Sequence, residues 1–397
     1  MASAQGINKH IAYKKETTWG TKATASSPSG ILLRRVTGSF QLEKDTYASS
    51  EILGSQQVRD MRHGTRKSSG SISGELSGNA YEDFMAAALR QDFAAGSTTG
   101  SVITISATST TYVRSGGSFV TDGFNVGDVV NVTGFTTAGN NGLSLITAMS
   151  ATVLTVSALA GQTKGTEAAG NSVTVLGKGK KTYVPATGHT DDSFTFEEWY
   201  SDVESSRTFL GQQVDTMGLS LQPNSLATVD FGFVGKDGEA ATGTRYFTSP
   251  TAITAEGIYS APDGYLFIDG VANGVVTSLT INVANNITQE AVIGSNAIGA
   301  KSRGKVSVTV DGSAIFQNNT ILNYFNAETE VSLTYVLMSS DKTNAFSIHL
   351  PRVKFGSSST DDGEKVVIVS FSGTALEYTG SAVGVEPTTV QIQDTTL

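Results

Sequence analysis

The sequence predicts an all-β fold with one short helix in each of two tandem repeats, and a small β-domain inserted into the first repeat. Valine, threonine and serine recur in alternation, which is the pattern of strands that bury one face. The chain contains 43 glycines but 7 prolines, and this composition indicates many tight turns. At 397 residues, it is also too long for a single ordinary core.

The same order of elements occurs twice: a strand, a long polar hairpin, a second strand and a helix. In the first copy we expect these elements at residues 36–42, 47–66, 70–76 and 81–89. In the second copy we expect them at residues 276–283, 287–303, 306–310 and 320–325. Thr37 and Thr277 hold matching places 240 positions apart, a spacing that predicts a duplicated domain rather than a solenoid.

The first helix carries a start signal in the sequence. Asn79 is the expected N-cap, with Glu82 three residues later as in a capping box. Phe84, Ala88 and Leu89 then fall on one face at helical spacing, so we expect that face to be buried.

Each copy ends in three further strands. They are expected at residues 193–198, 209–221 and 227–234 in the first copy, and at 331–336, 346–355 and 366–373 in the second. Turns at 224–225 and 361–363 precede the last strand of each copy. Because the two copies match through their final strands, the duplication covers a complete domain.

One segment has no counterpart in the second copy. A linker-like stretch at 96–100 is followed by short strands, expected at 102–106, 129–133, 144–148, 153–156 and 172–176. The segment closes with the glycine- and lysine-rich residues 177–181, which we interpret as a flexible hinge. The simplest interpretation is a β-domain of about 80 residues inserted into a loop of the first copy.

These elements define the expected organisation of the chain. It comprises an N-terminal arm at 1–30, a first repeat domain at 31–95 and 180–247, the insert at 96–179, a second repeat domain at 248–392 and a C-terminal tail at 393–397. Trp19 favours an arm that docks, because an aromatic side chain gains nothing on a free tail. A mobile tail is the alternative.

Composition excludes several classes of function. The chain has no cysteine, so disulfides and thiolate metal sites are impossible, which fits assembly in a reducing compartment. Its formal net charge is −9, without a dominant basic face, and this opposes a tight grip on DNA phosphates. We also expect no signal peptide and no membrane-spanning segment.

No catalytic, cofactor-binding or metal-binding motif stands out. The four histidines are scattered, and His189 beside Asp191 and Asp192 is better explained as a solvated turn than as a cation loop. A polysaccharide-acting enzyme would need paired carboxylates, but adjacent residues such as Glu197 and Glu198 point to opposite faces of a strand. We therefore expect a protein that is not an enzyme and has no cofactor.

Two basic clusters occupy matching hairpins. Arg59, Arg62, Arg66 and Lys67 lie on the hairpin of the first copy, and Lys301, Arg303 and Lys305 hold the corresponding place in the second. Such clusters are either solvated loops or interface loops that meet acidic residues of a neighbouring subunit. Together with Trp19, they are the candidate contacts between subunits or between rings.

A duplicated β-domain favours assembly into a ring. Two copies per chain allow three chains to form six similar positions through head-to-tail contacts. If sheet edges meet across subunits, closure also removes edges that would otherwise aggregate. The long polar hairpins are suited to reaching from one ring to the next.

The sequence resembles the tail tube proteins of long-tailed, non-contractile bacteriophages in their tandem two-domain form. The resemblance covers nearly the whole chain and includes residues 209–214 and 229–236 among the closing strands. Residues 119–135 and 140–142 of the insert are similar to a module of phage virion proteins. A multidomain decoration protein of the virion, or a host-surface adhesin, is the alternative.

The resemblance implies a tube-type β-sandwich or barrel, stacked trimeric rings that are pseudo-hexameric, and a place in the virion tail after assembly in the cytoplasm of the host bacterium. It implies a tape-measure protein in the lumen, a tail terminator and distal tail or baseplate proteins as partners, and double-stranded DNA that passes without specific binding. A neutral or acidic lumen would fit, because a basic wall would retain DNA. We expect the insert to face outward, so that deleting residues 97–177 leaves assembly intact.

Overall fold

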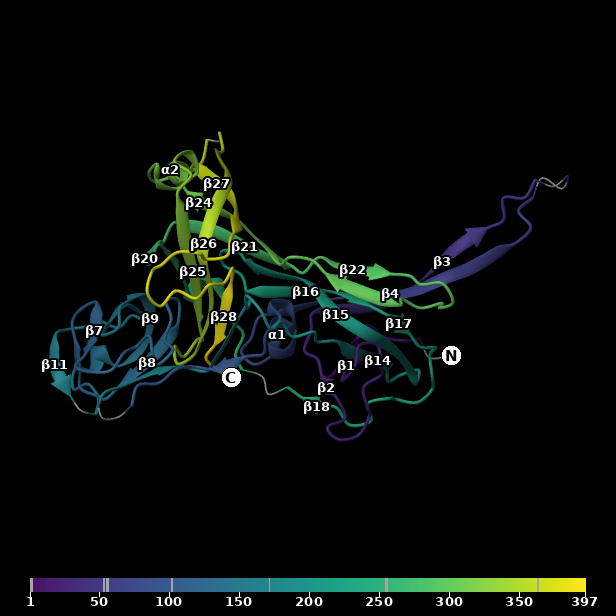
Figure 1. Ribbon diagram of the computed structural model, residues 1–397, viewed down its shortest axis with the longest axis horizontal. Helices are drawn as coiled ribbons and strands as arrows, with labels where there is room; N and C mark the ends of the chain where they lie inside the picture. The colour runs from purple at the N-terminus through teal and green to yellow at the C-terminus, as the bar shows by residue number, and fades with distance from the viewer. Residues whose placement is uncertain are drawn as a thin grey trace.

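The computed structural model describes residues 3–52, 54, 57–100, 103–170, 172–253, 256–362 and 364–397. The predicted all-β class is confirmed, since strands dominate and the α-helices are two short ones, α1 (Glu82–Leu89) and α2 (Thr320–Asn326) (Figure 1). Three single turns of 3₁₀-helix, Gly6–Asn8, Ala138–Asn140 and Ala261–Asp263, complete the helical part of the described chain. None of the helices described is long and apolar enough to cross a membrane.

The first half of the chain builds a sheet in which six strands pair in the order β1-β14-β15-β16-β4-β3. The strands of this half, including short ones beside the six, are β1 (Lys9–Lys15), β2 (Ile31–Leu32), β3 (Thr37–Ala48), β4 (Met61–Glu75), β5 (Ala94–Ala95), β13 (Lys180–Tyr183), β14 (Phe194–Tyr200), β15 (Ser205–Leu221), β16 (Thr228–Gly235), β17 (Asp237–Gly238) and β18 (Thr251–Ala252). The predicted N-terminal arm is extended in β1, but it lies within this sheet, and Ile11, Ala12 and Tyr13 are buried.

The second half repeats the same strand order, β19-β25-β26-β27-β24-β21. Its strands are β19 (Gly264–Ile268), β20 (Val271–Ala272), β21 (Val276–Ala284), β22 (Ile287–Glu290), β23 (Ala300–Arg303), β24 (Ser307–Ile315), β25 (Glu330–Met338), β26 (Ala345–Thr360), β27 (Ile368–Ala375) and β28 (Gln391–Asp394). The predicted C-terminal tail begins inside β28, where Gln393 and Asp394 are buried. The two halves of the chain therefore share one strand order, while the domain boundaries given from the sequence stay a prediction.

The insert forms a sheet of its own, ordered β11-β6-β7-β10-β9-β8-β12. Its strands are β6 (Ile105–Ala107), β7 (Thr111–Arg114), β8 (Val129–Thr133), β9 (Gly142–Met149), β10 (Val153–Ala158), β11 (Glu167–Gly170) and β12 (Thr174–Gly177). Tyr112, Phe119 and Phe124 are fully buried within it. The strand predicted at 102–106 begins outside the described residues, and β7 and β11 were not predicted.

The predicted flexible hinge at 177–181 is wrong, because the insert is fastened to the second half of the chain. Gln393 of β28 bonds both the N–H and the carbonyl of Val129, at 2.7 and 2.8 Å. Residues from both sides share one buried cluster, with Val129, Leu143, Leu145 and Leu159 from the insert and Phe267, Val336, Met338 and Ala345 from the second half. Lys180 and Lys181 belong to β13, which pairs with β28.

The predicted cap of α1 is also wrong. The N-cap is Tyr81, without a capping side-chain bond, while Asn79 has a positive φ of 57°. The backbone N–H of Asn79 donates instead to the Asp394 carboxylate at 2.9 Å, so tertiary contact with β28 decides where this helix begins. Phe84, Ala88 and Leu89 are buried, as predicted.

Candidate assembly surfaces

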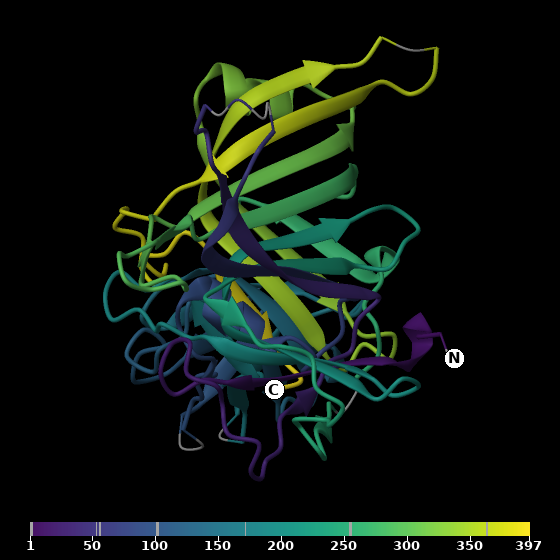
Figure 2. The ribbon, with the colours of Figure 1, turned by 90° about the vertical axis from the view of Figure 1, so that its right-hand side faces the viewer.

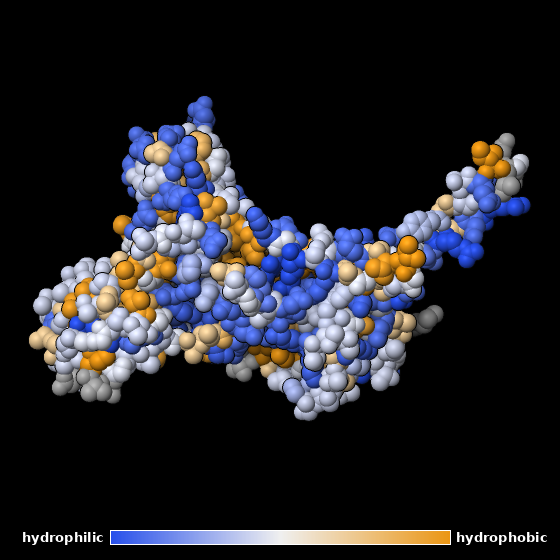
Figure 3. All heavy atoms as spheres, viewed as in Figure 1, coloured by the Kyte–Doolittle hydropathy of each residue, from blue (hydrophilic) through white to orange (hydrophobic). Residues whose placement is uncertain are grey.

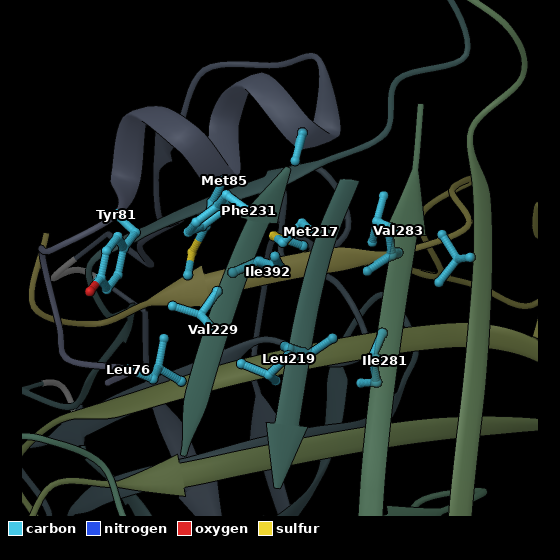
Figure 4. Packing of buried hydrophobic residues seen from close by; sticks show 14 of the residues in the cluster. Leu76, Tyr81, Met85, Met217, Leu219, Val229, Phe231, Ile281, Val283 and Ile392 are labelled. Atoms are coloured by element: carbon cyan, nitrogen blue, oxygen red, sulfur yellow. The ribbon is translucent and has the colours of Figure 1, made fainter. Parts of the chain in front are cut away.

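The two halves of the chain meet edge to edge. Strand β15 pairs antiparallel with β21, from Thr216 opposite Ala284 to Leu221 opposite Leu279. Behind this seam, Met217 and Leu219 of β15 lie beside Ile281 and Val283 of β21, beneath α1 (Figure 4). The junction therefore has continuous backbone pairing and a continuous apolar core.

The seam turns the two halves into one eight-stranded sheet. Its order is β3-β4-β16-β15-β21-β24-β27-β26. Figure 2 shows these strands following one another from the purple strands of the first half to the yellow strands of the second. The sheet crosses the boundary between the repeats without a break in its hydrogen-bond ladder.

One face of this sheet is buried and the other is polar. The polar face is defined by residues that lie opposite one another on successive strands: Ser39, Gln41, Ser71, Ser73, Thr216, Gly218, Ser220, Asp230, Thr280, Asn282, Thr309, Asp311, Ser313, Ser370, Ser372 and Thr374. These residues include two aspartates, and the same face continues at its ends to two lysines, Lys67 opposite Glu43 and Lys354 opposite Thr374. At its rim, Lys67 lies 3.8 Å from the Glu43 carboxylate, and Lys354 lies 2.9 Å from that of Glu328.

In the part of the chain that the structure describes, strand β3 at one end of the eight-stranded sheet, and residues 355–360 of β26 at the other end, have a neighbouring strand on one side only. On β3, the N–H of Phe40 donates to Glu198 at 3.0 Å, and the carbonyl of Gly38 accepts from Lys9 at 2.9 Å. Side chains thus take the place of a strand there. On β26, residues 355–360 pair with β27 on one side, while β25 and β28 pair with earlier residues of the strand.

The two hairpins differ in their surroundings. The β22–β23 hairpin packs over the first half, where Gln289 donates to the carbonyl of Gly235 at 2.8 Å. The β3–β4 hairpin instead projects from the body of the molecule (Figure 1). Among its described residues, the exposed large apolar side chains are Tyr47, Ile52, Val58 and Met61, and Figure 3 shows apolar atoms near the end of the hairpin.

An ion-pair cluster fastens the β22–β23 hairpin to the first half. Asp191 lies 2.7 Å from Lys301 and 3.0 Å from Arg303. Burial acts to raise the pKa of Asp191, but hydrogen bonds from Lys301 and Gln213 and the charge of Arg303 hold it below its ordinary value. Burial also lowers the pKa of Lys301 and of Arg303. This cluster is partly removed from water.

The structure brings together three of the candidate contact residues. Trp19 donates from its indole N–H to the carbonyl of Gly211 at 3.0 Å, and the Lys301 ammonium lies 5.2 Å from its ring centre. Arg303 lies beside the same Asp191 carboxylate as Lys301. Trp19, Lys301 and Arg303 therefore contact the junction between the two halves of their own chain.

The other candidate residues lie on the hairpin of the first half or at the base of the second hairpin. Arg66 pairs with Asp237 at 2.6 Å, and Arg62 pairs with Asp60 of the same hairpin at 3.0 Å. Arg59 and Lys305 are exposed, as is Lys67 beside Glu43. These residues do not form one cluster.

Sequence reasoning missed the polar pair that closes the seam. Arg90, at the end of α1, donates to the side-chain and backbone oxygens of Asn285 at 2.7 and 3.0 Å. The backbone N–H of Asn285 donates to the carbonyl of Asp215 at 2.7 Å. The adjacent Asn285 and Asn286 at the end of a predicted strand were the available signal.

The comparison with protein families agrees with this architecture. A family model described as phage tail tube protein matches residues 6–375. The chain belongs to the phage tail tube protein family. A comparison with curated proteins found no match.

Membership makes this tail tube protein a structural component of the phage tail, a kind of protein that assembles with itself and with other tail proteins. The described residues contain no group of three or more His, Cys, Asp or Glu side chains placed to hold a metal ion. The surfaces that matter for a tail tube protein are therefore the sheet edges, the hairpins and the polar face.

Proposed function

We propose that this tail tube protein closes head to tail into rings of three chains, and that the rings stack into a tube that conducts DNA. The observation that carries the proposal is the β15–β21 seam, which joins two halves of the same strand order edge to edge. The β3 and β26 edges remain at the two ends of the joined sheet, so the same kind of contact can be made between chains.

The number of chains in a ring follows from the duplication. Three chains supply six similar positions, the arrangement that the resemblance to tandem tail tube proteins implies. Closure would satisfy the backbone groups at both outer edges, which an open sheet leaves available for uncontrolled pairing.

The polar face is the proposed wall of the channel. Its serine, threonine and aspartate side chains are uncharged or anionic, and the lysines at its ends, Lys67 and Lys354, pair with Glu43 and Glu328, so binding of DNA phosphates by counterion release would be weak. The insert packs on Phe267, Val336 and Met338, which belong to β19 and β25 rather than to the polar face of the eight-stranded sheet. This placement supports an insert outside the channel.

The remaining partners are also part of the proposal. A tape-measure protein would occupy the lumen during assembly in the host cytoplasm, and a tail terminator and distal tail or baseplate proteins would cap the tube. Double-stranded DNA would later pass through without specific binding. The alternative, a decoration protein or adhesin, would use the same β-domains as separate particles.

Negative-stain electron microscopy of the purified protein, with analytical ultracentrifugation over a concentration series, tests the proposal. We expect rings or tubes with a central channel. Monomers or discrete trimers that never stack, at any concentration reached, would favour the decoration protein or adhesin.

A further inference from the structure

We infer that the β15–β21 seam inside the chain has the same strand pairing as the interface between subunits. The seam therefore specifies the register in which β3 of one chain pairs with β26 of the next. The inference rests on the proposed function and adds to it a residue-level contact. It follows from the equivalence of the two halves, from the exposed strand edges and the exposed side of α2, and from the placement of charged residues.

Strands β15 and β26 can be aligned because each contains a β-bulge at the same place in its half. In β15 the register against β16 shifts between Val214 and Thr216, and in β26 the register against β27 shifts between Phe355 and Ser357. The extra residues are therefore Asp215 and Gly356, 141 positions apart. A bulge is a specific feature of a strand, so a bulge at the same place in both halves fixes the alignment.

The alignment of β3 with β21 follows from their partners. Ser39 lies opposite Ser71, while Thr280 lies opposite Asp311, and these two pairs hold the same place in their sheets. Thr37 is therefore equivalent to Ser278 and not, as expected from the sequence, to Thr277, because the register of β21 shifts between Val276 and Ser278. Gly218 of β15, which lies opposite Asn282 of β21, is equivalent to Ser359 of β26. By the same alignment, Asn282 is equivalent to Gln41. The Gly218–Asn282 pair, transferred to the interface between chains, therefore places Gln41 of one chain opposite Ser359 of the next.

The transferred register joins four residues of each strand. It places Glu43 opposite Ser357, Leu42 opposite Ser358, Gln41 opposite Ser359 and Phe40 opposite Thr360. The outward N–H of Asn285, bonded to Asp215, corresponds to that of Lys44, which would donate to Gly356. Thr360 would then replace Glu198 as the partner of the Phe40 N–H.

In the second half, α2 is less covered than its counterpart α1 in the first half. Six residues of α1 are buried, and Arg90 ties that helix to Asn285 and Gly304 of the second half. In α2 one residue, Ile321, is buried, and Phe325 is exposed. By equivalence, the base of the β3–β4 hairpin of the next chain covers α2. The exposed Tyr47 and Met61 of that hairpin supply apolar surface for this contact.

Charge follows the same pattern. Asp191 lies three residues before the start of β14 pairing at Phe194, and it binds Lys301 and Arg303 of the second hairpin. Glu328 holds the corresponding place before Val331 of β25 and is exposed. The first hairpin carries Arg62 and His63 where the second carries Ser302 and Arg303. In the assembly that we infer, Glu328 would face the first hairpin as Asp191 faces the second, with His63 in the place of Arg303 and Arg62 in the place of Ser302.

Disulfide trapping tests the register, and the absence of native cysteine removes background. The test variant is Gln41→Cys with Ser359→Cys, which join as a non-hydrogen-bonded pair, the closer kind in antiparallel strands. The matched control is Ser39→Cys with Ser357→Cys, on the same face but four residues out of register. Gly218→Cys with Asn282→Cys reports the equivalent pair within one chain.

Assembled material is oxidised and run on non-reducing gels, with microscopy of the same samples. We expect Gln41→Cys/Ser359→Cys to yield covalent dimers and trimers, while Ser39→Cys/Ser357→Cys stays monomeric. Tubes that form without the expected cross-link, or that cross-link in the control, would overturn the register and leave the proposed function standing. Failure of every variant and of the parent protein to form rings or tubes would overturn both.

Discussion

Glu198 accepts a hydrogen bond from the backbone N–H of Phe40 at 3.0 Å, on the edge of β3 that faces away from β4. Its carboxylate also lies 2.6 Å from the Lys9 ammonium, which donates to the carbonyl of Gly38 on the same edge. A buried ion pair therefore satisfies the strand edge in the single chain. Charged side chains placed on an edge are a known means of preventing uncontrolled pairing.

Replacing Glu198 by alanine should destabilise the unassembled subunit. The change removes the acceptor of the Phe40 N–H and leaves the mostly buried Lys9 without its 2.6 Å partner. Loss of one member of a buried ion pair typically costs about 3 kcal/mol or more. Urea denaturation at a concentration below assembly measures the loss. Glu256→Ala, at an exposed position, is the control, and equal effects of the two substitutions would contradict the role given to Glu198.

The insert should stabilise the second half of the chain, which is contrary to the expectation that deleting residues 97–177 leaves assembly intact. Deletion would uncover Phe267, Val336 and Met338, which the insert buries. We expect the truncated protein to have a lower melting temperature and to aggregate before it can assemble. A truncated protein with an unchanged melting temperature would show that this contact is unimportant.

A single substitution can test the same contact without deletion. Leu145 is buried in the cluster that the insert shares with the second half, so Leu145→Ala should lower the free energy of unfolding by about 2–4 kcal/mol. Leu176→Ala, at a partly exposed leucine of the insert, should change it much less. Chemical denaturation of both variants gives the comparison, and similar losses would mean that the cluster has no special role.

His349 should make stability depend on pH in the mildly acidic range. Burial lowers the pKa of His349 to about 4, while an unfolded chain has a histidine pKa of about 6.5. The unfolded state therefore takes up a proton first as the pH falls. Stability is complete above pH 6.5 and decreases between about 6.5 and 4, by roughly 3 kcal/mol for this group.

Denaturation curves at several pH values, for the parent protein and for His349→Gln, measure this contribution. The variant cannot titrate at this position, so its free energy of unfolding should have a smaller slope against pH. The slope is the readout because the substitution also disturbs the bond between His349 and Thr334, which is 2.7 Å long. His63→Gln is the control for the loss of one histidine at an exposed position.

The repeated order of strands and helices could be predicted from the sequence, because alternation and element order are local properties. Strand β8 was predicted at its observed bounds, and the closing strands of both copies were found. The bulges at Asp215 and Gly356 were not predicted, since a bulge depends on the partner strand as well as on the strand itself. The alignment of β15 with β26 could not be derived without them.

The candidate contacts were only partly predictable for a similar reason. The matching basic hairpins were visible in the sequence, but Lys301 and Arg303 bind Asp191 of their own chain. Sequence order does not tell whether a hairpin contacts its own neighbouring domain or another subunit. Likewise, residues 177–181 have the composition of a hinge, yet Lys181 is held 2.8 Å from Asp128 and its strand pairs with β28.

The polar face should be sensitive to added positive charge. Thr309 and Thr374 lie opposite each other on β24 and β27 and are exposed, so lysine at both positions buries no charge. Repulsion between the two lysines and Lys354, which lies opposite Thr374, should cost about 1 kcal/mol. If this face lines the channel, each ring gains several cations that can displace counterions from DNA. We expect tubes of Thr309→Lys/Thr374→Lys to retain short duplex DNA in co-sedimentation, with retention that falls steeply as salt is raised.

The control for this prediction places the same charge on the insert. Thr121→Lys with Ala169→Lys changes two exposed residues there and adds an equal number of lysines per chain. Tubes of this control should bind DNA more weakly at equal ionic strength, because its added charges are spread over an outer surface instead of surrounding one duplex. Equal retention by both variants would show that total charge, rather than its position on the polar face, governs binding, and the assignment of this face to the channel would fail.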